Sequence, residues 1–125
     1  MNLLLDTHVF LWLAGGIQPL SQRAVEAMTD PGNVVYVSAA TAWEIAIKRG
    51  MRKLTAPHDL AAEIERLRFK ALPITIAHAE AVAALPRVHN DPFDRLLLAQ
   101  AVTEELHLVT RDAVMREYAV PIIRA

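Results

Sequence analysis

Acidic side chains follow apolar runs at two places in this sequence. Asp6 comes directly after Leu3-Leu4-Leu5, and Asp112 follows Leu108-Val109-Thr110 after one residue. Ligands of open parallel sheets bind outside the carboxyl ends of the strands, so both acids are candidates for a functional site. The structural alternative is helix capping, which a lone Asp at a strand-to-helix junction often performs.

Two further carboxylates stand within predicted helices. Glu44 is the only charge in Ala39–Ile47, whose apolar residues surround the helix on nearly every side, so we expect this helix to be buried. A buried carboxylate needs a cation or a basic partner, and Lys48, one turn later, is the structural alternative. Asp94 occupies the third position of a helix that Asp91-Pro92 begins, where the helix dipole favours an acid. We assign Asp91 to capping.

Four carboxylates in one crevice repel one another unless a cation neutralises them. The four acids are Asp6, Glu44, Asp94 and Asp112. Their oxygens favour Mg²⁺ or Mn²⁺, while the chain has no cysteine and its five histidines lack a zinc-binding spacing. Such a site suits phosphodiester hydrolysis, because the metal polarises the phosphate and lowers the pKa of the attacking water. Thr7 and Thr110 could orient that water or only satisfy backbone groups.

Alternating strands and helices are predicted to position these residues. Apolar runs predict strands at Leu3–Leu5, Val34–Val37, Ala71–Ile74, Leu106–Thr110 and Ala119–Ile123. Periodicity predicts helices at Thr7–Ala14, Ser21–Thr29, Ala39–Arg49, Pro57 to about Leu67, Ala77–Leu85, Asp91-Pro92 to Glu105, and 112–117, with Ser21 and Ser38 as caps. Strands that are apolar throughout indicate a parallel sheet covered on both faces. The fold class is therefore α/β, with three α/β/α layers and a central parallel sheet of four to five strands.

The composition predicts one domain over residues 1–125, without membrane association. The chain has 14 acids against 13 Lys plus Arg and is 54% hydrophobic. Its apolar start lacks the basic residues of a signal peptide and ends at Gly15-Gly16, short of the roughly 20 residues of a membrane span. The absence of cysteine fits a reducing cytoplasm.

The charge balance excludes binding of nucleic acid by bulk positive potential. The sequence pI is near 6.5, whereas domains that bind in this way tend toward a pI above about 9. Any contact must be local, and residues 48–70 hold seven bases and three acids, a net charge of +4. The candidates for contacts with nucleic-acid phosphates are Lys48, Arg49, Arg52 and Lys53. Bases placed favourably at a helix C-terminus are the structural alternative.

In their order along the chain, these residues resemble the PIN domain, and specifically the ribonuclease toxins of VapBC-type toxin-antitoxin pairs. The resembling segments are Leu3–His8, Ser38–Lys48, Leu72–Thr75, His89–Ala101 and Leu108–Asp112. The resemblance implies a Mg²⁺- or Mn²⁺-dependent endoribonuclease whose metal-binding acids are Asp6, Glu44, Asp94 and Asp112, the fourth being the most variable in such domains. It also implies an RNA substrate, a cognate antitoxin that covers the site, and a toxin homodimer.

Two other classes of protein remain as alternatives. A phosphoacceptor signalling domain has this size and an acidic Mg²⁺ site. Such a domain requires adjacent acids after the first strand, whereas in this sequence Thr7 follows Asp6. A catalytically inactive PIN scaffold would bind RNA or a protein partner without cleavage. Apolar residues between Leu54 and Leu67 could dock an antitoxin helix or pack on the protein's own core.

Overall fold

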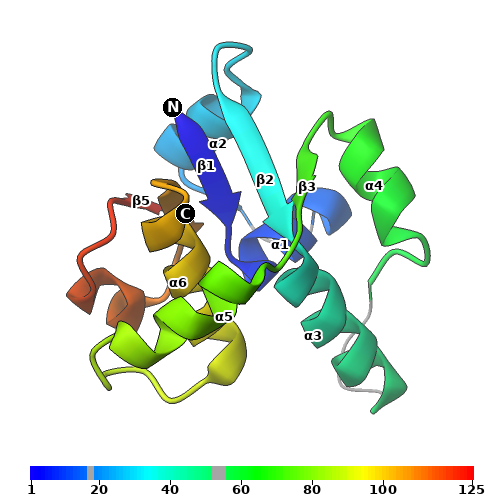
Figure 1. The fold of residues 1–125 in the computed structure, drawn as a ribbon. Helices are drawn as coiled ribbons and strands as arrows, with labels where there is room; N and C mark the ends of the chain where they lie inside the picture. Colours follow the sequence, from blue (N-terminus) through cyan, green and yellow to red (C-terminus); the bar gives the residue numbers. More distant parts are fainter. Residues whose placement is uncertain (17–18, 52–55) are drawn as a thin grey trace.

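The computed structural model describes residues 1–16, 19–51 and 56–125, which form helices around a five-stranded sheet (Figure 1). The strands are β1 (Asn2–Leu5), β2 (Val34–Ser38), β3 (Lys70–Leu72), β4 (His107–Thr110) and β5 (Ile122–Arg124). The α-helices are α1 (Thr7–Gly15), α2 (Gln22–Thr29), α3 (Ala39–Gly50), α4 (Leu60–Arg66), α5 (Ile76–Ala81) and α6 (Pro92–Thr103), and the 3₁₀ helices are η1 (Val82–Ala84) and η2 (Ala113–Glu117). None of the described helices is long and apolar enough to cross a membrane.

The sheet is parallel throughout, in the order β3-β2-β1-β4-β5. On one side of β1, Leu3 lies opposite Val35 of β2, and on the other, Leu5 lies opposite Val109 of β4. The chain therefore changes direction across the sheet at β1, and a ligand crevice is expected beyond the carboxyl ends of β1 and β4. The predicted fold class is confirmed. The doubly wound order of phosphoacceptor domains is 2-1-3-4-5, so the strand order contradicts that alternative.

Two hydrophobic cores, one on each face of the sheet, join the sheet to the helices that cover it, which gives three layers. Leu3 and Leu5 point into a core that contains Phe10 of α1, while Leu4 points into a second core that contains Leu97 of α6. All five side chains have no exposed surface. Full burial of a side chain of this size contributes roughly 1.5–3 kcal/mol, so β1 is held firmly from both sides.

Several predicted elements have different bounds in the structure, including the last strand, predicted at Ala119–Ile123 and found at Ile122–Arg124. Strand β3 ends at Leu72, because Pro73 has no backbone N–H to continue the ladder. The helix predicted at Ala77–Leu85 is divided into α5 and the 3₁₀ helix η1. Residues 112–117 form the 3₁₀ helix η2 with Asp112 outside it as the N-cap, and Gly50 is the last residue of α3 instead of following it.

The expectation that the helix around Glu44 is buried on nearly every side is wrong. Trp43 is 57% exposed and Ile47 is 38% exposed, although Glu44 and Ile45 are buried. Figure 1 shows the reason, since α3 begins at the carboxyl end of β2 and runs away from the sheet. Apolar periodicity cannot distinguish a face covered by the protein's own core from one left at the surface.

A buried polar link joins the elements that carry Glu44 and Asp94. The Ser38 hydroxyl caps α3 by accepting from Ala40 N and donates to Gln100 Oε1 of α6. Gln100 Nε2 donates in turn to Pro73 O at 3.3 Å. Ser38 and Gln100 are 1% and 0% exposed, so these bonds form in a medium where an unpaired polar group is costly.

Replacement of Gln100 by Leu is predicted to destabilise the fold. Gln100→Leu leaves the Ser38 hydroxyl and the Pro73 carbonyl without this partner, which costs about 1–3 kcal/mol of unfolding free energy. Urea denaturation followed by circular dichroism measures the loss. The control is Thr103→Ala, on an exposed position of the same helix, which should stay within about 0.5 kcal/mol of the wild type. Equal stability of the two variants would contradict the role of the link.

Candidate active site

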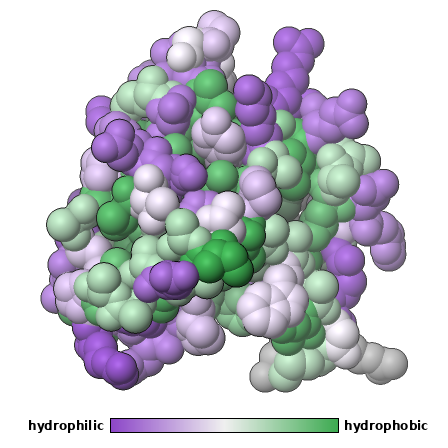
Figure 2. Space-filling view, viewed as in Figure 1, coloured by the Kyte–Doolittle hydropathy of each residue, from purple (hydrophilic) through white to green (hydrophobic). Residues whose placement is uncertain are grey.

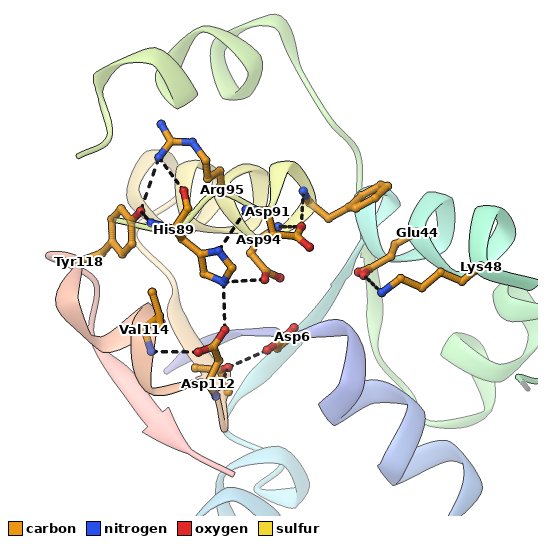
Figure 3. A network of polar contacts seen from close by, with 12 residues as sticks. Asp6, Glu44, Lys48, His89, Asp91, Asp94, Arg95, Asp112, Val114 and Tyr118 are labelled. Carbon is orange, nitrogen blue, oxygen red and sulfur yellow. Dashed lines mark hydrogen bonds and ion pairs between the residues drawn. The ribbon is translucent and has the colours of Figure 1, made fainter. Parts of the chain in front are cut away.

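A pocket of about 350 Å³ opens at the carboxyl edge of the sheet, and all four predicted acids line it. Asp6 lies between β1 and α1, Glu44 is on α3, Asp94 is in the first turn of α6, and Asp112 lies between β4 and η2. Figure 3 shows their side chains directed toward a common space. The tertiary structure thus brings together acids that are far apart in the sequence.

Asp6 is a buried acid that is not used as a helix cap. Its side chain makes no capping hydrogen bond to α1, although it occupies the N-cap position, so the capping alternative is wrong for this residue. Thr110 Oγ1 donates instead to Asp6 Oδ2 at 2.7 Å and accepts from Asp112 N at 3.0 Å. Burial raises the pKa of Asp6, and the hydrogen bond from Thr110 opposes this rise. The Thr7 hydroxyl is hydrogen-bonded to the Thr41 hydroxyl and not to one of the four acids.

Glu44 has one paired and one unpaired oxygen. Lys48 Nζ lies 2.6 Å from Oε2, so the predicted ion pair is present, and this bond raises the pKa of Lys48. Oε1 is buried and has no hydrogen-bond partner among residues 1–16, 19–51 and 56–125. A buried acceptor of this kind is rare in proteins and marks a position where an ion or water is needed.

Asp94 is the acid whose protonation is most affected by its surroundings. Burial raises its pKa to about 7, and the negative charges of Asp6 and Asp91 contribute to the rise. Asp91 itself caps α6, since its Oδ1 accepts from Phe93 N at 2.8 Å and from Asp94 N at 3.1 Å. The assignment of Asp91 to capping is confirmed.

His89 is a site residue that sequence reasoning missed. Its Nε2 lies 2.9 Å from Asp94 Oδ2 and 3.0 Å from Asp112 Oδ2 (Figure 3). Its Nδ1 accepts the backbone N–H of Asp91, which places the proton of the neutral ring on Nε2. In that tautomer Nε2 donates to both carboxylates and offers no lone pair, so His89 positions the two acids more readily than it binds a metal with them.

The loop that carries His89 is fixed by Arg95 and Tyr118. Tyr118 Oη accepts from His89 N at 2.7 Å and donates to Pro86 O at 3.0 Å. Arg95 donates to Pro86 O at 2.8 Å and to Val82 O at 3.0 Å. The only local signal for His89 in the sequence was its place just before the Asp91 cap, which says nothing about a contact with Asp112.

Asp112 has both a capping and a site contact. Its Oδ1 accepts from Val114 N at 2.9 Å, as the capping alternative predicted, while its Oδ2 faces His89. The fourth predicted acid is therefore at the pocket, but one of its oxygens is already engaged by the backbone of η2.

Not all of the basic residues predicted to contact RNA line the pocket. Lys48 lines it, whereas the Arg49 guanidinium donates to Pro57 O and is not among its lining residues. Arg52 and Lys53 lie outside the described residues.

An acidic pocket at the switch point of an open parallel sheet defines the class as an α/β protein with a carboxylate site suited to hard cations. Comparison with known proteins then identifies the family. The chain belongs to the PIN domain family, whose model matches residues 3–121. This confirms the family inferred from the sequence.

Individual relatives extend over nearly the whole chain. The chain is 29% identical to Ribonuclease VapC22 of Mycobacterium tuberculosis over 123 residues, which cover 96% of this chain and 94% of the relative. Among solved structures, VapBC2 from Rickettsia felis bound to a promoter DNA fragment matches with a TM-score of 0.74 at 14% identity, covering 99% of this chain and 98% of that one. VapBC-5 from Mycobacterium tuberculosis matches with a TM-score of 0.62 at 24% identity and the same coverage. These structures show the shared fold.

The raised pKa of Asp94 predicts that the metal-free protein loses stability as the pH rises. Its pKa is about 7 in the folded protein against 3.8 ordinarily, so the folded state binds the proton more tightly and the free energy of unfolding falls between about pH 4 and pH 7. Asp94→Asn abolishes this loss. In EDTA, the variant should match the wild type near pH 4 and exceed it at pH 8 by at most on the order of 4 kcal/mol.

Thermal denaturation from pH 4 to pH 8 measures this difference. Asp59→Asn is the matched control, because Asp59 is an exposed cap of α4 and Asn also caps helices. A pH slope for Asp94→Asn equal to that of the wild type would show that Asp94 does not carry the effect.

Proposed function

We propose that this chain is a Mg²⁺- or Mn²⁺-dependent endoribonuclease that acts as the toxin of a type II toxin-antitoxin pair. The pocket that Asp6, Glu44, Asp94 and Asp112 line is the observation that carries the proposal. The names of the relatives support it, since one is a ribonuclease and the two solved neighbours described above are VapBC proteins, a family of toxin-antitoxin systems.

The residues of the pocket fit a hard divalent cation. Oε1 of Glu44 is a buried oxygen without a partner in the described part of the chain, and burial raises the pKa of both Asp6 and Asp94. A cation would satisfy the free oxygen and remove the repulsion that disfavours the anions. Asp6, Glu44 and Asp94 would hold it, with Asp112 as the fourth acid.

Each acid has a neighbour that sets its position or charge. When bound, a divalent cation lowers the pKa of an attacking water and offsets the negative charge of the phosphate. Thr110 orients the Asp6 carboxylate, and His89 holds Asp94 beside Asp112. Lys48 is half-buried at the pocket, where its ammonium can leave Glu44 for an RNA phosphate once a cation takes its place.

Loss of one carboxylate is predicted to abolish most RNA cleavage. Purified protein should cleave structured RNAs with Mg²⁺ or Mn²⁺ and not in EDTA, and Asp6→Asn or Asp94→Asn should lower the rate about 100-fold or more, because the amide binds a hard cation poorly. Asp91→Asn is the matched control. It makes the same change in the same pocket, but Asn keeps the capping function, so cleavage should remain close to the wild-type rate.

Two outcomes would count against the proposal. Equal rates of cleavage by the wild type and Asp6→Asn would contradict the assignment of the active site to this pocket. Calorimetry with Mn²⁺ tests the inactive-scaffold alternative, since a wild-type protein that binds Mn²⁺ no better than Asp6→Asn has no functional metal site.

An antitoxin is the proposed protein partner, with an apolar groove of about 560 Å³ as its docking site. The groove lies between α3, α4 and β3 and is lined by Val37, Ala42, Leu60, Ala61, Ile64 and Leu72, among others. Figure 2 shows hydrophobic residues reaching the surface among hydrophilic ones on this side of the molecule. Leu60 and Ile64 are half-buried and pack on the core, as the structural alternative for this amphipathic segment predicted, while the antitoxin contact stays a prediction.

A charge in the groove is predicted to weaken antitoxin binding. Ala61 is exposed and lines the groove, so Ala61→Glu would bury a charge under an apolar partner and reduce affinity for the product of the neighbouring small reading frame at least about tenfold. Ala62→Glu is the matched control, because Ala62 is exposed on the same helix and is not a lining residue. Calorimetry measures both, and equal affinities would place the partner elsewhere. The toxin homodimer implied by the resemblance stays a prediction, which sedimentation analysis tests.

A further inference from the structure

We propose that His8, Trp12 and Arg111 form a nucleobase subsite on the wall of the acidic pocket, where one base of the RNA strand stacks beside the phosphate to be cleaved. The proposal rests on the proposed function, which it deepens by naming residues that select the sequence at the cut. None of the three belongs to the acidic cluster or contributes a metal-binding carboxylate.

The three side chains form one continuous wall. All three line the same pocket as Asp6 and Asp112. His8 and Trp12 lie one turn apart on α1, with ring centroids 5.7 Å apart and planes inclined by 38°. The Arg111 guanidinium lies over the Trp12 ring, with Cζ 4.4 Å from its centroid. A cation at this distance is attracted by the ring face, so the stack is held together internally.

Arg111 is held in a fixed orientation although it is exposed. Its Nε donates to Ala125 O at 3.1 Å and its Nη2 donates to Pro19 O at 2.6 Å. One face of the guanidinium therefore rests on Trp12, while the residue remains open to the pocket. A purely structural role for Arg111, which links two backbone segments, would account for these hydrogen bonds. It would not explain why the exposed His8 and the half-buried Trp12 line the pocket as well.

The same strand ends place the wall and the acids. β1 and β4 are paired, and Asp6 N donates to Val109 O at 3.0 Å. His8 follows Asp6 by two residues, and Arg111 directly precedes Asp112. This pairing fixes the backbone that carries His8 and Arg111 relative to the backbone of Asp6 and Asp112, so a group stacked on the wall lies next to the acids.

The chemistry of the wall fits a base better than a phosphate. Bases of single-stranded RNA stack on Trp and His rings and on guanidinium planes, whereas the four acids on the other walls repel phosphates that no cation offsets. The pocket volume, about 350 Å³, is at the small end of the range of roughly 300–1,000 Å³ for ligand pockets. It therefore matches one nucleotide unit and not a duplex.

Fluorescence of Trp12 tests the subsite directly and without cleavage. The chain has two tryptophans, so Trp43→Phe leaves Trp12 as the only one, and Trp12→Phe leaves Trp43 as the matched control. The probes are five-nucleotide single-stranded RNAs, intact or abasic at one position, titrated with Mg²⁺ into these proteins carrying Asp94→Asn, so that cleavage is slow and the cation offsets the remaining acids. We expect intact RNA to quench Trp12 and the RNA that is abasic at the stacking position not to do so. Quenching that is equal for every abasic position, or absent, would overturn the proposal.

Cleavage specificity provides the second readout. With Mn²⁺, Trp12→Leu and Arg111→Lys should raise KM about tenfold and weaken the base preference at the cut while kcat is largely kept, and Trp12→Phe should retain the preference. Arg116→Lys, an exposed position of η2, is the control for Arg111→Lys. Thermal denaturation confirms that each variant is folded.

The outcomes separate this proposal from the proposed function. Normal cleavage with unchanged base preference in both variants would overturn the subsite and leave the nuclease intact. Absence of cleavage by the wild type would overturn the nuclease, while base-dependent quenching of Trp12 would still support a base-binding wall. Loss of antitoxin binding without a change in RNA preference would assign the wall to the protein partner and overturn the subsite.

Discussion

The burial of several negative charges at one end of a parallel sheet is the constraint on which the rest of the structure depends. Asp6 and Glu44 are 7% and 3% exposed, and burial, together with the charges of neighbouring acids, raises the pKa of Asp94 to about 7. Anions kept from water in this way must be offset locally. Each of them accordingly has a donor from another part of the chain or the next helical turn, and the offset is incomplete, because one Glu44 oxygen lacks a partner in the described residues.

The fold tolerates this arrangement because the surrounding packing is apolar and continuous. β1 is buried from both faces and places Asp6 at the centre of the carboxyl edge. The Ser38 to Gln100 link then fixes the start of α3 against α6, so that Glu44 and Asp94 converge although 50 positions separate them. The free energy gained by burying the two cores thus offsets the cost of holding the acids close together in the pocket.

Membership of the PIN family identifies the fold, whereas the pocket geometry shows which side chains a ligand would contact. The family model covers residues 3–121, a range that contains the four acids and strands β2, β3 and β4. The wall formed by His8, Trp12 and Arg111 adds aromatic and guanidinium surfaces to the same pocket. In our proposal the acids supply the chemistry of phosphodiester hydrolysis, while the wall selects the base beside the cut.

The sequence by itself determined the succession of strands and helices along the chain, the parallel sheet, the caps at Ser21, Ser38 and Asp91, and the four acids of the pocket. These features follow from patterns within a few residues, namely apolar runs, helical periodicity and capping residues. Only the tertiary structure decided that Asp6 does not cap α1 while Asp112 caps η2, how His89 bridges Asp94 and Asp112, and which face of α3 remains exposed. These features depend on contacts between elements far apart in the chain, and no local pattern encodes the distance between two such side chains.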